Sequence, residues 1–153
     1  MNWNEFLELD DKYSNDEIKK KCIKFVFLWM EYNTFYNKTY DEPKERDRAT
    51  ALNIETINEK YNSVKERYLR TFEQLPCSEG IRTFIKNMQN GRKIYYDRNE
   101  NNLEKFLNVV YQIRCNLFHG DKLSQDSNAK IIAWAYDCLY DLLKDTEVLT
   151  NPQ

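Results

Sequence analysis

The fold of this chain follows first from residues 14–40, which read SNDEIKKKCIKFVFLWMEYNTFYNKTY. Ser14 and Glu17 have the spacing of a capping box, in which Ser14 caps a helix and Glu17 reaches back to the cap. After this start, apolar and aromatic side chains recur every three or four positions. They are Ile18, Cys22, Phe25, Trp29, Tyr32, Tyr36 and Tyr40. That period is typical of a helix with one buried face, so the stretch predicts an amphipathic helix from about residue 15 to 38.

The same helical period continues over the next part of the chain. A second long helix is expected from about residue 44 to 74, because Pro43 suits a first turn and Pro76 cannot continue a helix. A shorter helix is expected from about residue 78 to 89, where four apolar residues keep the period. The dipeptide Asn90-Gly91 that follows is a typical turn signal.

Two further helices complete the predicted fold. Asn102 is expected to cap the first, whose apolar face runs to Leu117 and whose end lies at Gly120. The second carries its apolar face from Ile131 to Leu143, and residues 148–153 are expected to form a frayed tail. We therefore predict an all-α fold, an antiparallel helical bundle of four main helices plus a short one.

Length and composition limit the protein class. A chain of 153 residues is the size of one domain, expected to span residues 1–153 with a core from about 15 to 145. Three glycines and three prolines are too few for a turn-rich β protein. The net charge of −2 gives no general attraction to nucleic acid, so any polyanion must bind locally. Four scattered cysteines and one histidine do not suggest a zinc site, and we expect neither a metal nor a cofactor.

The sequence also predicts where the protein acts. The N-terminus is polar and acidic, and the longest apolar run, residues 25–30, is too short to cross a bilayer. We therefore expect a cytoplasmic chain with reduced thiols and no membrane partner.

A polar group of unusual composition lies at the end of the fourth expected helix. Residues 113–120 read IRCNLFHG and contain Arg114, Asn116 and the only histidine, His119. Cleavage of RNA by its own 2′-hydroxyl needs a base, an acid and a cation that stabilises the phosphorane, and these side chains can supply them. One histidine per chain means that a two-histidine acid–base pair would require two chains.

A structural explanation of the same residues stays open. A histidine near a helix C-terminus interacts favourably with the dipole, and an arginine beside a core can reach water. Moreover, five residues turn a straight helix by about 140° net, so Arg114 and His119 would not share one face of it.

Two patches of this chain resemble one known family. Residues 111–120, with the pattern Arg114-x-x-x-x-His119, resemble the R-x4-6-H signature of the HEPN (higher eukaryotes and prokaryotes nucleotide-binding) superfamily. Residues 27–36 are similar to the W-x-x-aromatic-N-x-x-Y helix of that family, through Trp29, Tyr32, Asn33 and Tyr36. The two patches occur in the order that the family has.

The resemblance implies a helical domain that forms a homodimer and acts as a metal-independent endoribonuclease, often as a toxin or an antiphage defence effector. Arg114 would bind the scissile phosphate and His119 would be the acid–base residue. Asn116 would be a polar helper, and Asn33 would face the same cleft. An antitoxin or another regulatory protein would be a further partner. The alternative is a non-catalytic HEPN module that binds nucleotide, RNA or a protein partner.

A locally basic segment is a second candidate for RNA contact. It runs from residue 82 to 98, with Tyr95 and Tyr96 available to stack on bases. Its cations are Arg82, Lys86, Arg92, Lys93 and Arg98. A solvated helix face and loop is the alternative interpretation.

Overall fold

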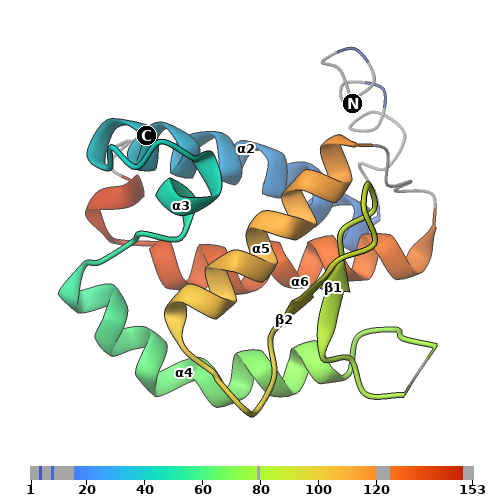
Figure 1. Cartoon of the computed structure of the whole chain (residues 1–153). Coiled ribbons are helices and arrows are strands. Elements are labelled where there is room, and N and C mark those ends of the chain that lie inside the picture. The colour runs from blue at the N-terminus through green and yellow to red at the C-terminus, as the bar shows by residue number, and fades with distance from the viewer. Residues whose placement is uncertain (1–3, 5–7, 9–15, 79, 120–124, 150–153) are drawn as a thin grey trace.

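The computed structural model describes residues 4, 8, 16–78, 80–119 and 125–149. Over these residues the chain is mostly helical and packs as a bundle with a small two-stranded hairpin on one side (Figure 1). The elements in chain order are α2 (Glu17–Thr39), α3 (Glu45–Ala49), α4 (Glu55–Glu73), β1 (Phe84–Lys86), β2 (Lys93–Tyr95), α5 (Leu103–Phe118), α6 (Asp126–Leu143) and the 3-10 helix η1 (Glu147–Leu149). The predicted helical bundle with four main helices is therefore confirmed, and its short helix is α3 rather than the one expected over residues 78–89.

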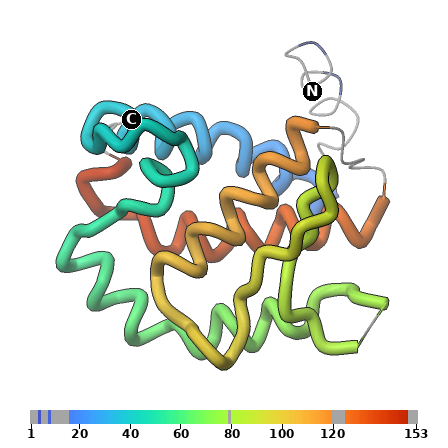
Figure 2. The backbone as a smooth tube through the Cα atoms, in the orientation of Figure 1, coloured from blue at the N-terminus to red at the C-terminus, as the bar shows by residue number. Residues whose placement is uncertain are grey.

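Helix α6 lies at the centre of the bundle, with α2, α4 and α5 packed against it (Figure 2). Helices α4 and α5 run against α6, whereas α2 runs in the same direction (Figure 1). The direction of α2 follows from its contacts, because Cys22 near its start bonds Ala129 near the start of α6, 3.3 Å away. The end of α2 packs against η1, which follows α6. Helices α4 and α5 are thus antiparallel to α6, and α2 is parallel to it.

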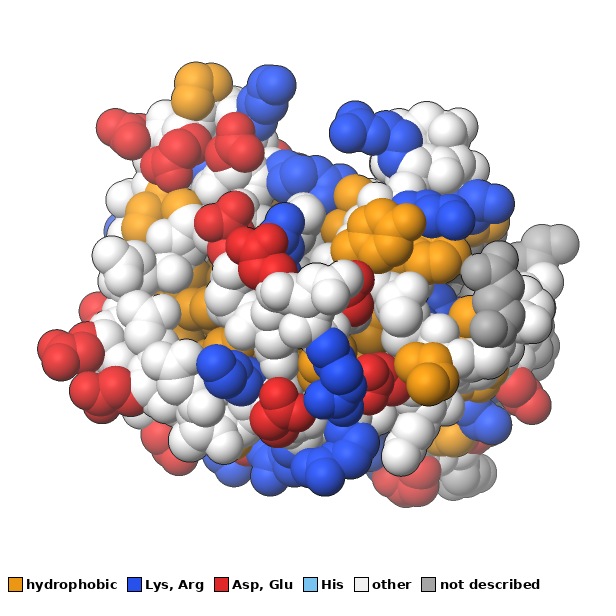
Figure 3. Space-filling model, turned by 60° about the horizontal axis from the view of Figure 1, so that its bottom comes forward, with side chains coloured by type: hydrophobic (Ala, Val, Ile, Leu, Met, Phe, Trp, Pro, Cys, Tyr) orange, Lys and Arg blue, Asp and Glu red, His pale blue; other side chains and the backbone are white. Residues whose placement is uncertain are grey.

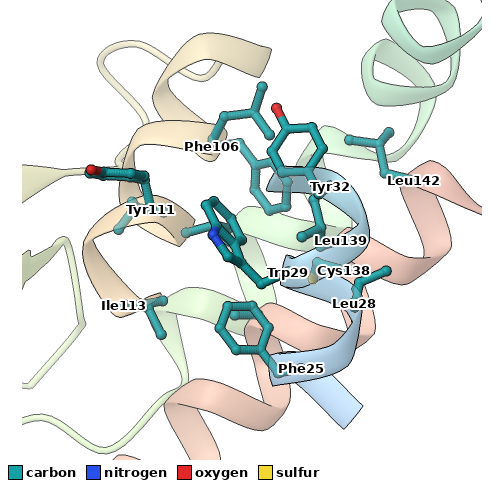
Figure 4. Close-up of a cluster of buried hydrophobic side chains, with 14 of the residues drawn as sticks. Phe25, Leu28, Trp29, Tyr32, Phe106, Tyr111, Ile113, Cys138, Leu139 and Leu142 are labelled. Atoms are coloured by element: carbon teal, nitrogen blue, oxygen red, sulfur yellow. The ribbon is translucent and has the colours of Figure 1, made fainter. Parts of the chain in front are cut away.

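The core is built around an aromatic cluster on α2. Trp29 is 2% exposed and lies among side chains of α2, α5 and α6 (Figure 4). Its ring centre is 5.3 Å from that of Tyr32 and 6.0 Å from that of Tyr111 on α5. The predicted apolar face of α2 is confirmed, because the residues that keep its period from Cys22 to Tyr36 are buried.

The helix starts are fixed by short polar side chains. The Asp16 carboxylate caps α2 and accepts hydrogen bonds from the backbone N–H groups of Ile18 and Lys19 at 3.0 and 3.2 Å. The predicted cap, Ser14, lies outside the described residues. Asn102 caps α5 as predicted, since its side-chain oxygen accepts from Lys105 N at 2.9 Å.

The second long helix was expected to be continuous from 44 to 74, and this expectation is wrong. It is divided into α3 and α4 by a non-helical link over residues 50–54. The link turns Leu52 into the core, where it is 5% exposed. Tyrosine hydroxyls support the break, because Tyr32 donates to Ala49 O at 2.5 Å and Tyr40 accepts from Asn53 N at 3.1 Å. Tertiary contacts of this kind override a regular period in the sequence.

The prediction of a short helix over residues 78–89 is also wrong, because this segment contains β1 instead. Strand β1 pairs antiparallel with β2, with Ile85 opposite Ile94. A helix would have buried Ile81 and Met88 together with Ile85, yet they are 67% and 61% exposed and only Ile85 is buried. The predicted turn at Asn90-Gly91 is confirmed, and Gly91 has the positive φ of 76° that favours glycine.

The frayed tail was expected to start at residue 148, but Val148 is 5% exposed and belongs to η1. Its apolar side chain packs with the core cluster. Residues 150–153 lie outside the described part. None of the helices in the described part has the length and apolar character that a bilayer crossing requires.

We predict that Trp29→Ala lowers the free energy of unfolding by about 3–5 kcal/mol, because it opens a cavity between three helices. Met30→Ala is the matched control, since Met30 neighbours it in the chain but is 52% exposed. The control should change stability by no more than about 0.5 kcal/mol. Denaturant unfolding followed by circular dichroism measures both, and similar losses in the two variants would contradict this description of the core.

Candidate functional site

Arg114 lies in the C-terminal part of α5, and its side chain is 23% exposed. Its Nη1 atom is 3.6 Å from Oε1 of Glu45 on α3 and 3.8 Å from the Cys115 sulfur. Its guanidinium carbon is 5.1 Å from the ring centre of Phe118 and 5.8 Å from that of Tyr111. The guanidinium is thus held between a carboxylate and two aromatic rings.

These neighbours stabilise the charged form of the Arg114 guanidinium. Burial acts to lower its pKa, but the hydrogen bond to Cys115 and the negative charge of Glu45 outweigh burial and raise the pKa above its usual value. Its Nε atom, in contrast, is buried with no hydrogen-bond acceptor among the described residues. Arg114 is therefore a permanent cation with one donor group left unsatisfied.

Glu45 is the functional residue that the sequence analysis missed. Its carboxylate accepts hydrogen bonds from Tyr36 Oη at 2.7 Å and from Tyr111 Oη at 3.2 Å, besides its ion pair with Arg114. It also accepts from Asn33 Nδ2 at 3.4 Å. The burial of Tyr36 and its bond to Glu45 raise the pKa of that hydroxyl, so it stays a donor. The one carboxylate therefore joins α2, α3 and α5.

Through Glu45 the structure brings together two of the predicted site residues. Asn33 and Arg114 both contact this carboxylate, so the two sequence patches that carry them meet in space. The sequence offers one general signal for such a residue, because a charge that borders a core needs a partner. It cannot select Glu45 from 25 acidic residues, since Glu45 and Arg114 lie far apart in the chain.

Asn116 is buried, 6% exposed, and connects α5 to the hairpin. Its oxygen accepts from Met88 N at 3.1 Å and from Gln112 Nε2 at 2.9 Å. Its amide nitrogen donates to Lys86 O at 2.8 Å. The side chain is thus engaged on both ends, and its observed role is to fasten the start of the hairpin turn to α5.

His119 is exposed and forms the C-cap of α5. Its backbone N–H donates to Cys115 O at 3.0 Å, which ends the helix. Its ring Nδ1 atom is 3.1 Å from Nε2 of Gln89 in the hairpin turn. When Gln89 donates this bond, the neutral ring carries its proton on Nε2. The predicted glycine cap at Gly120 lies outside the described residues.

The end of α5 therefore presents two sides. Arg114 faces α3 and Glu45, whereas Asn116 and His119 contact the hairpin. No hydrogen bond or ion pair between described residues joins Arg114 to His119. This agrees with the angular separation that five helical residues impose.

The basic segment from 82 to 98 is divided by its contacts. Arg98 forms ion pairs with Glu73 at 2.8 Å and with Glu66 at 3.1 Å, both on α4, so its guanidinium fastens the segment after β2 to that helix. Arg82 donates from Nη1 to Phe84 O at 3.0 Å and from Nη2 to Pro76 O, which braces the loop after α4. Neither guanidinium is arranged as a free surface cation.

The remaining three cations of that segment lie on the exposed side of the hairpin. Lys86 and Lys93 are cross-strand partners, and Arg92 lies between them in the turn. On the face shown in Figure 3, basic and acidic side chains are interspersed, and the whole chain carries a net charge of −2. Any attraction of a polyanion is therefore local.

Comparisons with protein-family models, with curated proteins and with solved structures found no match to this chain. In the described part of the chain, no group of three or more His, Cys, Asp or Glu side chains is placed to hold a metal ion.

We predict that Glu45→Ala lowers the free energy of unfolding by about 1–3 kcal/mol, because the Tyr36 hydroxyl and Arg114 lose their acceptor. Glu45→Gln keeps one acceptor oxygen and should lose less. Asp47→Ala on the exposed side of α3 is the control, expected to stay within about 0.5 kcal/mol of the wild type. Denaturant unfolding gives the three values, and an equal loss in the Asp47 variant would refute the role of Glu45.

Proposed function

We propose that this chain is a metal-independent endoribonuclease of the HEPN superfamily. The observation that carries the proposal is a permanent cation, Arg114, with an unsatisfied buried N–H group on the same helix end as the exposed imidazole of His119. The two sequence patches that resemble the family also meet at Glu45. Their convergence supports the family assignment.

The proposed reaction uses the 2′-hydroxyl of the RNA as the nucleophile. A base removes the 2′ proton, the 2′ oxygen forms a bond to phosphorus, and the bond from phosphorus to the 5′ oxygen breaks. An acid then protonates the leaving 5′ oxygen. Arg114 stabilises the negative charge of the phosphorane, and His119 serves as the proton-transfer group. The products are a 2′,3′-cyclic phosphate and a free 5′-hydroxyl.

A homodimer supplies what a single chain lacks. Base and acid act on opposite sides of the phosphorus, and each chain has one histidine. In the proposed site, His119 and Arg114 of one chain meet the same residues of a second copy. Gln89 contacts the imidazole from the hairpin turn. The exposed Arg92, which follows in the chain, would contact the RNA backbone.

The biological setting belongs to the same proposal. An unregulated ribonuclease would harm its own cell, so we place this chain in the cytoplasm as a toxin or antiphage defence effector. An antitoxin or another regulatory protein would hold it inactive.

A second candidate function is favoured by one observation. Arg114 and Asn116 both have structural partners, Glu45 and the hairpin backbone, which a non-catalytic module would retain equally well. Such a module would bind nucleotide, RNA or a protein partner without cutting RNA.

The decisive experiment is incubation of the purified protein with total RNA in excess EDTA. The wild type should cut RNA, and His119→Ala and Arg114→Ala should reduce the rate by about 10²–10⁴-fold, the usual contribution of such groups. Arg70→Ala, an exposed arginine of α4, is the control and should cut normally.

Thermal unfolding of each variant separates loss of chemistry from loss of fold. The His119 variant should unfold at the wild-type temperature, because the imidazole is exposed. RNA that is bound but left intact by the wild type would favour the non-catalytic module. Cleavage at equal rates in all variants would overturn the assignment of the site.

The dimeric site predicts an unequal result for mixed dimers. A dimer with one wild-type chain and one His119→Ala chain, isolated with two different affinity tags, should cut RNA far more slowly than half the wild-type rate. Each site would then have one histidine instead of two. Retention of half the activity, or a solution mass of a single chain for the active species, would contradict a composite site.

A further inference from the structure

A cavity of about 560 Å³ lies between the hairpin, the loop after α4 and the first turn of α6. Its size falls in the range of small-molecule sites. Neither Arg114 nor His119 lines it, so it is separate from the proposed ribonuclease site.

Three cations line this cavity: Arg82, Lys86 and Lys93. No carboxylate is among its described lining residues. Lys86 and Lys93 lie directly opposite each other in the hairpin register, and neither has an ion-pair partner among the described residues. Like charges opposed across two strands destabilise the pair, and a bound anion would offset this repulsion.

Arg82 adds a fixed positive charge to the wall. Its two terminal nitrogens are held by backbone carbonyls of Phe84 and Pro76, and its Nε atom is buried with no acceptor in the described part. Burial also lowers the pKa of this guanidinium. A half-buried charge with no counter-ion is unfavourable by itself, so this group would be stabilised by a negative ligand.

The rest of the wall is mixed in character. Ser127 and Asn128 line it from the first turn of α6, where the helix dipole also favours an anion. Phe84 and Ile131 contribute apolar surface. The Lys93 ammonium lies 4.7 Å from the ring centre of Phe84, so charge and aromatic surface are adjacent. Asp126, which precedes Ser127, is not among the described lining residues. Its side chain is 86% exposed, and its carboxylate lies 3.6 Å from Lys19 Nζ.

We propose that this cavity binds a small organic phosphomonoester. Lys86 and Lys93 contact the phosphate, and Phe84 and Ile131 contact the apolar part of the ligand. A phosphate accounts for the three unpaired cations, and the apolar wall accounts for an organic group attached to it. This inference does not depend on the ribonuclease proposal, because neither Arg114 nor His119 lines the cavity.

Cys77 provides a built-in reporter of occupancy, because it lines the cavity and is half-buried. AMP is the probe, and adenosine is the same molecule without the phosphate. Millimolar AMP should slow alkylation of Cys77 by iodoacetamide at least about fivefold, whereas adenosine should not. Cys115 beside Arg114 is the internal reference, and peptide mass spectrometry follows both thiols in the full chain.

The lysines give the matched variants. Lys86→Gln and Lys93→Gln should each raise the AMP concentration for half-protection by about tenfold, the loss of one charge-assisted hydrogen bond. Lys24→Gln, on the exposed side of α2, should leave it unchanged. Calorimetric titration with AMP measures the same affinities independently of Cys77 reactivity.

Three outcomes would overturn the proposal: no AMP binding at millimolar concentration, equal protection by adenosine, or normal protection in both lysine variants. Protection by a short RNA oligonucleotide but not by AMP would also overturn it, and would assign the cavity to the RNA backbone. If the His119 variant loses RNA cleavage but still binds AMP, the AMP site is separate from the site of RNA cleavage.

Discussion

The carboxylate of Glu45 is the constraint on which this end of the molecule depends. A helix of five residues such as α3 has no stability of its own in water, because the first turn costs more than it returns. Contacts of Glu45 with Tyr36, Tyr111 and Arg114 hold it against α2 and α5. Arg46 strengthens the attachment, since its Nη2 atom donates to Gln112 at 2.8 Å. The position of α3 in turn fixes where Arg114 is directed.

The last turns of α5 are held from the opposite side by the hairpin. The side-chain oxygen of Gln112 accepts a hydrogen bond from Arg46, and its amide nitrogen donates one to Asn116. Asn116 in turn forms hydrogen bonds with the backbone of Lys86 and Met88. One chain of side-chain hydrogen bonds therefore connects α3 to the hairpin across α5. The buried amides make this a rigid connection, because every broken bond would leave a polar group without water. A hairpin of three-residue strands would be marginal alone and derives its position from this network.

Features of this structure that depend on neighbouring residues could be predicted from the sequence, whereas features that depend on contacts between distant residues could not. The long periodic stretches from Cys22 to Tyr36 and from Phe106 to Leu117 gave correct helices, because the period is a local property. The break over 50–54 and strand β1 were missed, because tyrosine hydroxyls decide the first and the packing of β1 on α5 decides the second. Likewise, spacing alone predicted Arg114 and His119 at one helix end, but not that Glu45 and Gln89 orient them.

The structural engagement of Arg114 does not by itself argue against chemistry at that residue. A catalytic cation acts best when its orientation is fixed before substrate arrives, since no free energy is then spent on ordering it. Glu45 takes one terminal nitrogen, and the rings of Tyr111 and Phe118 restrict the plane of the guanidinium. His119 is fixed more loosely, by one side-chain bond to a hairpin turn. In the proposed ribonuclease, the fixed guanidinium of Arg114 would meet the charge of the phosphorane, and the imidazole of His119 would transfer the proton.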